Sequence, residues 1–451
     1  MKLRQSTIGL MIIAGTLTAT TTSCKKGCTD PNAINYNADA KKDDPDDPCV
    51  YDMSGEWYTV ETVNGVNYNK VIGTISEDRT MAASENWLIS GGVFVDEGAT
   101  LTIEAGTTIN AANDGTTPFL SILRGGKIMA CGSATSPIVF TPIKDNPLPG
   151  EWGGIIINGK APINVGLEAD GEGGTGTYGG TDATDNSGSL CYVRVEYAGK
   201  ILGTDNELNG FSFNGVGSGT SLEYLQAYRG SDDGFEFFGG TVSLKYAVST
   251  GNHDDSFDWT HGWTGNGQFW VVNQATDGGD RGIEGDNLGD NNAATPYTFP
   301  TISNVTLIGA DDGDASNQGM KLREGMKGNF YNIIIKGFPK RGCQVEHDIT
   351  ITNMNNGDLT LKNSIIDNVS PFKFTSSAGN DTTVAAMFDQ PVNENQTASD
   401  GSLVTFLNGY VGTSSTGAFN TAGLGSWFTS VNFIGAVESS SDWTAGWTIE
   451  L

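Results

Sequence analysis

The chain has 451 residues, of which 25 are basic and 53 acidic, so its formal net charge is −28. A chain this acidic is unsuited to binding nucleic acid or an anionic membrane surface, because both require basic patches. The 62 glycines, against 14 prolines, fit an all-β protein that is dense in turns, and the length allows one large repeat domain with appendages.

Residues 1–23 have the features of a secretory signal peptide, in which Lys2 and Arg4 precede a short apolar run over residues 8–17. The run is too short to be a transmembrane helix. The three residues before Cys24 are Thr, Thr and Ser, which resembles a bacterial lipoprotein box with Thr in place of the usual Leu. The resemblance implies acylation of Cys24 and attachment to the outer membrane, at the cell surface, through the lipid alone. A simple secreted protein cleaved nearby is the alternative.

An Asp-rich tether is expected over residues 24–55, with Cys28 and Cys49 as its bracketing cysteines. It resembles a short module found in surface proteins of the Bacteroidetes. We expect Cys28 and Cys49 to pair in an oxidising compartment, which would stabilise the loop by about 3 kcal/mol. The acids of this module either hold Ca²⁺ or form a solvated spacer.

A poorly patterned lead-in segment covers residues 56–86, and stacked coils are predicted over residues 87–371. Between residues 210 and 346, a pattern of Gly or Ser followed by alternating apolar and outward residues begins at positions 210, 234, 256, 282, 319 and 342. The separations are 24, 22, 26, 37 and 23 residues, and the alternation indicates strands. A second strand-like run, such as residues 222–228, lies within each repeat.

Strands this short bury a continuous core only when successive coils stack on one another. We therefore predict an all-β, right-handed parallel β-helix, with a β-sandwich as the rival architecture. The Gly-rich stretch 166–188 is expected to be a surface loop, and residues 372–451 are expected to form a Ser/Thr/Asn-rich tail with a C-terminal cap.

The remaining cysteines and tryptophans are assigned from the repeat positions. Cys343 occupies an apolar position and is expected to be a buried thiol, whereas Cys131 and Cys191 are either a disulfide or two core thiols. Trp259 is expected to face the core. Trp263 and Trp270 either pack internally or form an exposed platform on which sugars stack.

Four short sequences carry a family resemblance: DDGFEFFGG at residues 232–240, DDSFDW at 254–259, RGIE at 281–284 and DWTAGW at 442–447. They resemble a Bacteroidetes-type family of bacterial surface lipoproteins with right-handed β-helix repeats, and the resemblance spans residues 87–447. It implies the fold and a cell-surface location, and it implies an outer-membrane transporter as a partner. The family has no established biochemical activity, so the resemblance says little about function.

Stacking would align the outward residues of successive coils into columns. One predicted column contains Ser212, Glu236, Asp258, Glu284, Lys321 and Gln344, and its neighbour contains Asn214, Phe238, Thr260, Asp286, Arg323 and Glu346. Carboxylates about 5 Å apart repel by roughly 1 kcal/mol per neighbouring pair even in water, and a hard cation such as Ca²⁺ would remove this repulsion. The predicted metal ligands are the turn residues Asp232, Asp233, Asp254, Asp255, Asp277 and Asp280. Alternatively, these residues serve only the geometry of the turns.

Lys321 and Arg323 lie where the columns change sign. They either pair with Glu284, Asp286 and Glu346 or take part in catalysis. The catalytic alternative is a polysaccharide lyase or glycoside hydrolase that acts on acidic glycans, with Lys321, Arg323, Glu236, Asp258 and Glu284 as the candidate residues. We expect instead a non-enzymatic binding, adhesion or scaffold module, stabilised by calcium, with a glycan or a transporter as its partner. A deep cleft beside unpaired Lys321 and Arg323 would favour the enzyme.

Overall fold

The computed structural model of the chain describes residues 25–29, 35–42, 57–203, 206–310, 317–379, 388 and 391–451. The chain divides into two compact units, Met1–Asp52 and Met53–Leu451. In the first unit, Lys25 forms an ion pair of 2.9 Å with Asp39, and Cys28 is buried and disulfide-bonded. The signal peptide, Cys24 and Cys49 lie outside the described residues, so the lipid anchor and the pairing of Cys28 with Cys49 stay predictions.

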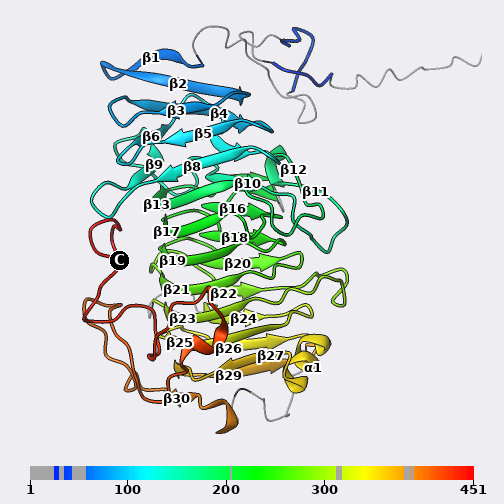
Figure 1. Cartoon of the computed structure of the whole chain (residues 1–451), viewed down its shortest axis with the longest axis vertical. Helices are drawn as coiled ribbons and strands as arrows, with labels where there is room; N and C mark the ends of the chain where they lie inside the picture. Colours follow the sequence, from blue (N-terminus) through cyan, green and yellow to red (C-terminus); the bar gives the residue numbers. More distant parts are fainter. Residues whose placement is uncertain are drawn as a thin grey trace, which may run out of the picture. The chain divides into compact units, whose positions relative to one another are not determined.

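The second unit is built of stacked strands that pair in parallel from coil to coil (Figure 1). The first coils contain β1 (Thr59–Val63), β2 (Val66–Ile75), β3 (Arg79–Met81), β4 (Trp87–Val95), β5 (Thr100–Ile103), β6 (Thr108–Ala111), β7 (Phe119–Ile122), β8 (Lys127–Cys131), β9 (Ile138–Pro142) and β10 (Ile155–Asn158). β2 pairs in parallel with β4, so the stack begins before the predicted boundary at residue 87. β1 forms an antiparallel hairpin with β2.

Two series of strands continue the stack. The long strands are β13 (Gly188–Glu196), β17 (Ser221–Tyr228), β19 (Ser243–Thr250), β21 (Asn266–Asn273), β23 (Thr301–Ile308) and β25 (Gly328–Lys336), followed by β27 (Leu359–Lys362), β28 (Ile365–Asp367) and β30 (Gln396–Ala398). The short strands are β16 (Phe211–Asn214), β18 (Phe235–Phe238), β20 (Phe257–Thr260), β22 (Arg281–Gly285), β24 (Gln318–Leu322), β26 (Arg341–Glu346) and β29 (Phe372–Thr375). β29 and β30 carry the parallel pairing beyond residue 371.

The register of the short strands confirms the predicted repeat. Phe211, Phe235 and Phe257 are direct neighbours in the parallel ladder, and their fully buried rings stack with centroids 5.1 and 4.9 Å apart. Trp263 and Trp270 are also fully buried, so an exposed platform of these two residues is wrong. The predicted right-handed parallel β-helix is confirmed, and the β-sandwich is excluded because successive strands pair in parallel.

A close approach between coils explains the glycine that opens five of the six repeats, whereas the third repeat opens with Ser256 instead. A Cβ atom on Gly210 would lie 2.6 Å from the carbonyl oxygen of Gly234, and a Cβ atom on Gly234 would lie 2.7 Å from that of Ser256. The same contact recurs at 2.7 Å between Gly282 and Gly319. These oxygens belong to the backbone of the next coil, which cannot move aside without breaking the ladder. The repeat glycines are therefore required by coil stacking.

Insertions and short helices lie outside the stacked strands. They are β11 (Ala169–Asp170), η1 (Glu172–Gly174), β12 (Thr177–Tyr178), β14 (Ile201–Gly203), β15 (Asn206–Glu207), α1 (Asp348–Asn356), η3 (Pro391–Asn393) and η4 (Thr421–Leu424). Residues 400–451, which we call the strap, run back along the outer side of the long strands, coloured orange to red in Figure 1. None of the described helices is both long enough and apolar enough to span a membrane.

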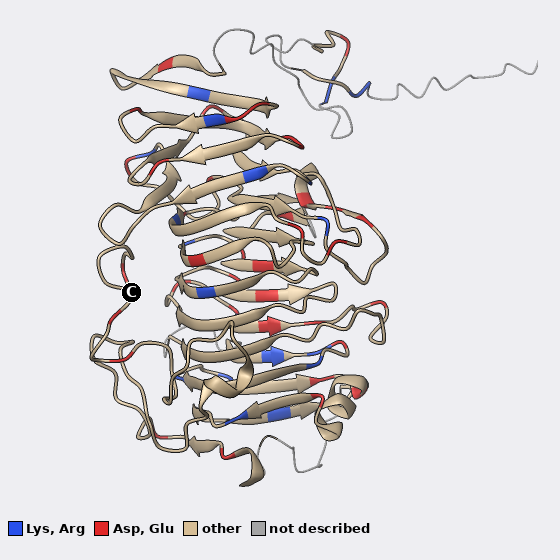
Figure 2. Ribbon diagram, in the orientation of Figure 1, with Lys and Arg blue, Asp and Glu red and all other residues tan. Residues whose placement is uncertain are grey.

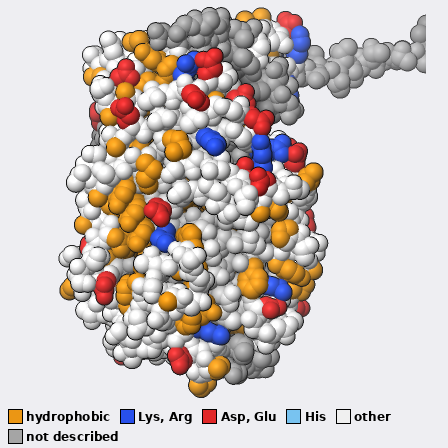
Figure 3. All heavy atoms as spheres, viewed as in Figure 1, with side chains coloured by type: hydrophobic (Ala, Val, Ile, Leu, Met, Phe, Trp, Pro, Cys, Tyr) orange, Lys and Arg blue, Asp and Glu red, His pale blue; other side chains and the backbone are white. Residues whose placement is uncertain are grey.

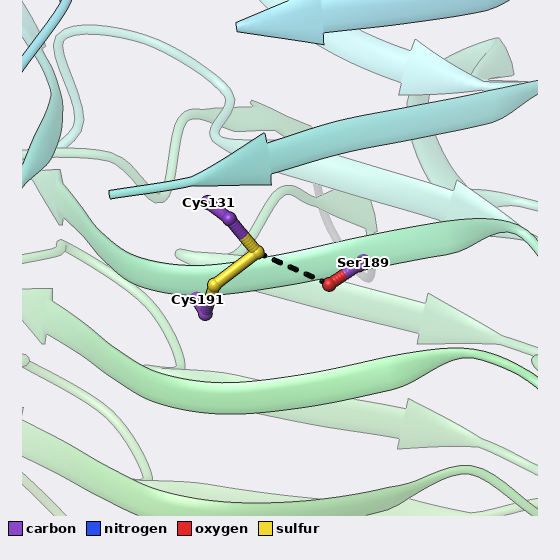
Figure 4. Close-up of a disulfide and its surroundings, with 3 residues drawn as sticks. All are labelled: Cys131, Ser189 and Cys191. Carbon is purple, nitrogen blue, oxygen red and sulfur yellow. Dashed lines mark hydrogen bonds between the residues drawn. A yellow bond between two sulfur atoms is a disulfide. The ribbon is translucent and has the colours of Figure 1, made fainter. Parts of the chain in front are cut away.

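The structure decides between the two alternatives for Cys131 and Cys191 and confirms the expectation for Cys343. Cys131 and Cys191 are opposite each other in the parallel pairing of β8 with β13, with Cα atoms 4.5 Å apart, and they form a disulfide (Figure 4). The bond therefore joins adjacent coils. Cys343 is a free thiol and is fully buried, as its apolar repeat position predicted.

Candidate functional site

The outer face of the short strands carries the predicted columns. Ser212 is opposite Glu236, and Glu236 is opposite Asp258. Further down the stack, Glu284 is opposite Lys321, which is opposite Gln344 in turn. Figure 2 shows acidic positions on β18, β20 and β22, followed by a basic position on β24. The face is therefore acidic over three coils and changes sign at the fourth.

Eight carboxylates of this face form four overlapping groups, and in each group three ligand atoms lie within 4.8 Å of one another. The groups are Asp232 with Asp233 and Asp254; Asp233 with Glu236 and Asp258; Asp254 with Asp255 and Asp280; and Asp255 with Asp258 and Glu284. We call these eight residues the acidic ladder. Five of the six predicted metal ligands belong to it, and so do the three carboxylates among the candidate catalytic residues.

The sixth predicted ligand, Asp277, lies apart from the ladder. Its side chain is 61% exposed, and it faces Arg229 at 3.5 Å and His253 at 4.0 Å. It lies in the turn between β21 and β22, three residues before Asp280, and the turn directs it away from the stacked positions. Spacing alone did not distinguish it from Asp280.

The turn aspartates of the ladder also connect coils. Asp233 Oδ1 accepts a hydrogen bond of 2.8 Å from the main-chain N–H of Asp255, and Asp255 Oδ1 accepts one of 2.6 Å from the N–H of Arg281. Each aspartate thus bonds to the equivalent position of the next coil. This is a role in turn structure, and it uses one carboxylate oxygen of each residue.

Basic side chains neutralise only the lower part of the ladder. Arg281 pairs with Asp280, with Glu284 at 3.1 Å and with Asp255 at 3.8 Å. Arg323 pairs with Glu284 and, at 2.8 Å, with Asp286.

The upper part of the ladder lacks such pairing. Among the described residues, no Lys or Arg forms an ion pair with Asp232, Asp233, Glu236, Asp254 or Asp258. We call these five residues the unpaired half of the ladder.

The electrostatics of the unpaired half follow from this arrangement. Burial, and then the charges of neighbouring carboxylates, raise the pKa of Asp233, Glu236 and Asp258 well above their ordinary values. For the same reasons the pKa of Asp232 is raised to about 8 and that of Asp254 to about 6. Free negative charge is therefore unfavourable in this half of the ladder, which favours bound protons or a shared cation.

Two further acids, which the sequence did not reveal, lie near the upper end. Burial, followed by the charge of Glu207, raises the pKa of Glu172 to about 7, and both residues contribute to the raised pKa of Asp232. Glu172 belongs to η1 and Glu207 to β15, which are parts of two separate insertions. Only the paths of these insertions bring them to the ladder.

The basic candidates for catalysis are occupied by ion pairs. Lys321 pairs with Glu346 at 3.4 Å, and Arg323 pairs with Glu284 and Asp286. The ion-pair alternative for these two residues is therefore the one that the structure contains. A cavity of about 520 Å³ lies elsewhere, at the first coils, and its lining includes Leu88 and Asp114.

A comparison with known families supports the architecture. Residues 73–448 match a family model described as a pectate-lyase like beta helix domain. Neither the curated proteins nor the solved structures with which the chain was compared match it. Because the family model covers most of the chain, the protein belongs to the family of proteins with a pectate-lyase-like β-helix domain.

Proposed function

We propose that the protein is a non-enzymatic binding module of the cell envelope, in which the acidic ladder holds calcium. The observation that carries this proposal is the contrast within the ladder. Glu284 and Asp255 have arginine partners, whereas Asp233, Glu236 and Asp258 converge to within 4.8 Å without one. A cation would take the place in the upper coils that Arg281 and Arg323 take in the lower ones.

Calcium suits this site better than other common metals. The ligand atoms are carboxylate oxygens, which hard cations prefer, and Ca²⁺ accepts six to eight oxygens in irregular geometry. Magnesium requires a tighter octahedron, which stacked strands at about 4.8 Å do not naturally provide. The described groups contain neither Cys nor His, which zinc sites typically use.

The proposal of a binding module rests on the state of the basic residues. A lyase needs a free base beside its substrate, within hydrogen-bond reach of the proton that it removes. Lys321 and Arg323 are instead held by Glu346, Glu284 and Asp286. Basic residues that are held in ion pairs suit a binding module, in which a cation bound by the unpaired half of the ladder would bridge the acidic face to an anionic ligand such as an acidic glycan.

A polysaccharide lyase or glycoside hydrolase is the second candidate. The raised pKa of Glu236 and of Asp258 favours it, because a carboxyl group with a raised pKa is suited to general acid catalysis. The membership of a pectate-lyase-like family agrees with either candidate.

The proposed location in the cell envelope rests on the sequence resemblance. It includes the lipid anchor at Cys24 and an outer-membrane transporter as a partner.

Calorimetric titration of the protein with calcium tests the metal site. We expect saturable binding that Glu236→Gln together with Asp258→Asn abolishes, while Glu85→Gln, an exposed residue outside the ladder, has no effect. A glycan array probed with and without EDTA then tests the ligand, and we expect binding to acidic glycans only when calcium is present. Equal heats for the wild type and the double variant would refute the calcium site. Release of unsaturated or hydrolysed products from a bound glycan would instead establish the enzyme.

A further inference from the structure

The long strands share an unusual bend on their outer side. In six successive coils, one residue of each long strand has a left-handed backbone conformation, with φ between 51° and 61°. These residues are Tyr192, Tyr224, Tyr246, Phe269, Asn304 and Asn332. Asn adopts this conformation readily, whereas bulky aromatic residues seldom do. The upper four coils therefore keep an aromatic side chain where the backbone disfavours one.

The aromatic side chains form a continuous outer surface. The rings of Tyr192 and Tyr224 stack at 4.2 Å, those of Tyr224 and Tyr246 at 4.3 Å, and those of Tyr246 and Phe269 at 5.0 Å. The strap lies on this surface, with Trp447 edge-on to Tyr192 at 5.7 Å and Trp443 edge-on to Tyr246 at 5.2 Å. Hydrophobic side chains gather in the left half of Figure 3, on the side along which the strap runs in Figure 1. Contact with these tryptophans explains why the four upper long strands have aromatic residues at their left-handed positions.

Side-chain amides of the long strands form hydrogen bonds with the main chain of the strap. In three places a single amide donates to the carbonyl oxygen of a strap residue and accepts from the N–H of the same residue, with distances of 2.7–3.0 Å. The pairs are Gln226 with Ile449, Gln268 with Thr429, and Asn332 with Phe419. Two cationic side chains form further hydrogen bonds with the strap. Arg194 donates to the main-chain carbonyl oxygen of Trp447 and Lys245 donates to that of Trp427, both at 2.7 Å.

The coils do not need the strap to complete their own ladders. The last named strand among the described residues is β30, which ends at Ala398. The polar contacts of the strap with the long strands come mainly from side chains of the coils to main-chain atoms of the strap. Apolar strap residues such as Ile434 and Val437 also pack against buried side chains of the coils. Recognition of an extended segment through its main chain, with pockets for its aromatic side chains, is the way in which proteins bind peptides.

We propose that the outer face of the long strands is a peptide-binding groove, that the strap is its intramolecular ligand, and that the strap of a second copy of the chain binds there in its place. The second copy is the occupant because its strap presents the same tryptophans and main-chain groups at the spacing that the groove accepts. Exchange of an identical segment between copies makes no new type of contact, so it needs only release and rebinding. The groove lies on the long strands and the acidic ladder on the short strands, so this proposal is independent of calcium binding.

The test begins with the full-length chain carrying a protease site inserted between Ser399 and Asp400, which are both exposed. After folding and cleavage, the fragment 400–451 is held only by the groove. Nicked protein with a fluorescently labelled fragment is then mixed with nicked, unlabelled protein of a different mass. We expect the label to pass to the second copy and an excess of unlabelled 400–451 peptide to compete for binding.

Variants locate the site of exchange. Gln226→Ala together with Gln268→Ala is expected to weaken fragment binding at least tenfold, and Gln268→Glu, which keeps the acceptor but loses the donor, is expected to weaken it less. Asn266→Ala is the matched control, because Asn266 lies on the same strand as Gln268 and its amide contacts Ser243 rather than the strap. Circular dichroism of the intact variants checks that each one folds.

Two outcomes support the proposal together: transfer of the label between copies, and loss of affinity in the Gln variants but not in Asn266→Ala. Three outcomes would overturn it. The fragment leaves on cleavage and does not rebind, or it stays bound and never exchanges, or it exchanges equally well in the Gln variants and the wild type.

Discussion

Asp233 accepts a hydrogen bond of 2.8 Å at its Oδ1 atom from the main-chain N–H of Asp255, the residue at the same position in the next coil. The bond gives Asp233 a structural role that an uncharged amide could also perform, because the Oδ1 of Asn accepts equally well. The negative charge of Asp233 has no such role, and its carboxylate is buried beside Glu236 and Asp258. One substitution can therefore separate the structural role of this residue from its proposed role in metal binding.

Replacing Asp233 with Asn is expected to abolish the effect of calcium on stability while preserving the fold. In the wild type, calcium at 100 times its dissociation constant would stabilise the protein by about 2.7 kcal/mol, which a thermal melting curve resolves. In Asp233→Asn the melting temperature in EDTA should match or exceed that of the wild type, because the buried cluster then contains one fewer acid whose ionisation is unfavourable. Asp182→Asn is the control, since exposed Asp182 accepts from Thr184 in a local turn. Identical wild-type melting with EDTA and with millimolar calcium would leave the ladder as structural aspartates only.

The stability of the calcium-free protein is expected to fall as pH rises from about 4 to about 8. In the folded protein the pKa of Asp232 is about 8 and that of Asp254 about 6, above the ordinary value of 3.8. Between these limits the folded state holds protons that the unfolded chain has released, so each rise in pH favours unfolding. Melting temperatures measured in EDTA from pH 5 to pH 8.5 check this. Excess calcium should remove most of the decline, because the cation takes the place of the protons. A curve that rises with pH in EDTA would contradict the raised pKa values.

Replacing Arg323 with Gln is expected to destabilise the protein by about 3–5 kcal/mol, the usual effect of removing one partner from a buried ion pair. The change leaves Glu284 and Asp286 without their closest cation, although Arg281 still contacts Glu284 at 3.1 Å. Urea denaturation measures the loss. Calcium should restore part of it, because Glu284 then resembles the unpaired half of the ladder.

Arg79→Gln is the matched control for this experiment. Arg79 pairs with Glu77, whose side chain is 73% exposed, so its removal should change stability by about 1 kcal/mol or less. If Arg323→Gln had an equally small effect, Arg323 would not be a structural counter-ion of the ladder and would be available for another role.

Replacing Gly234 with Ala is expected to cost about 1–3 kcal/mol, the range for overpacking in a dense interior. The added Cβ atom would lie 2.7 Å from the carbonyl oxygen of Ser256, on the next coil. Gly203→Ala serves as the control, since a Cβ atom there meets nothing within 4 Å. Urea denaturation of both variants measures the difference. Equal stability would mean that the coils separate easily, and the repeat glycine would then need another explanation.

The sequence by itself determined the coil and the positions that face outward. A period of two within each strand places Phe235 inside and Glu236 outside, and a repeat of about two dozen residues places Asp258 next to Glu236. These are consequences of local geometry and regular stacking, which any sequence with this pattern must follow. The register of Glu284 with Lys321 followed in the same way.

The ion pairing of Lys321 and Arg323 was one of the alternatives that the repeat pattern offered, but only the tertiary structure decided the other charge contacts. Arg281 lies among three acids, Asp277 turns away to Arg229, and Glu172 reaches the ladder from an insertion. The strap returns over Tyr224 from more than 200 residues further along the chain. These contacts depend on the paths of turns and insertions, which carry no periodicity, and on side-chain directions set by the whole packed structure. A repeat pattern predicts neighbours one coil apart, but it contains no information about segments that leave the coil and return.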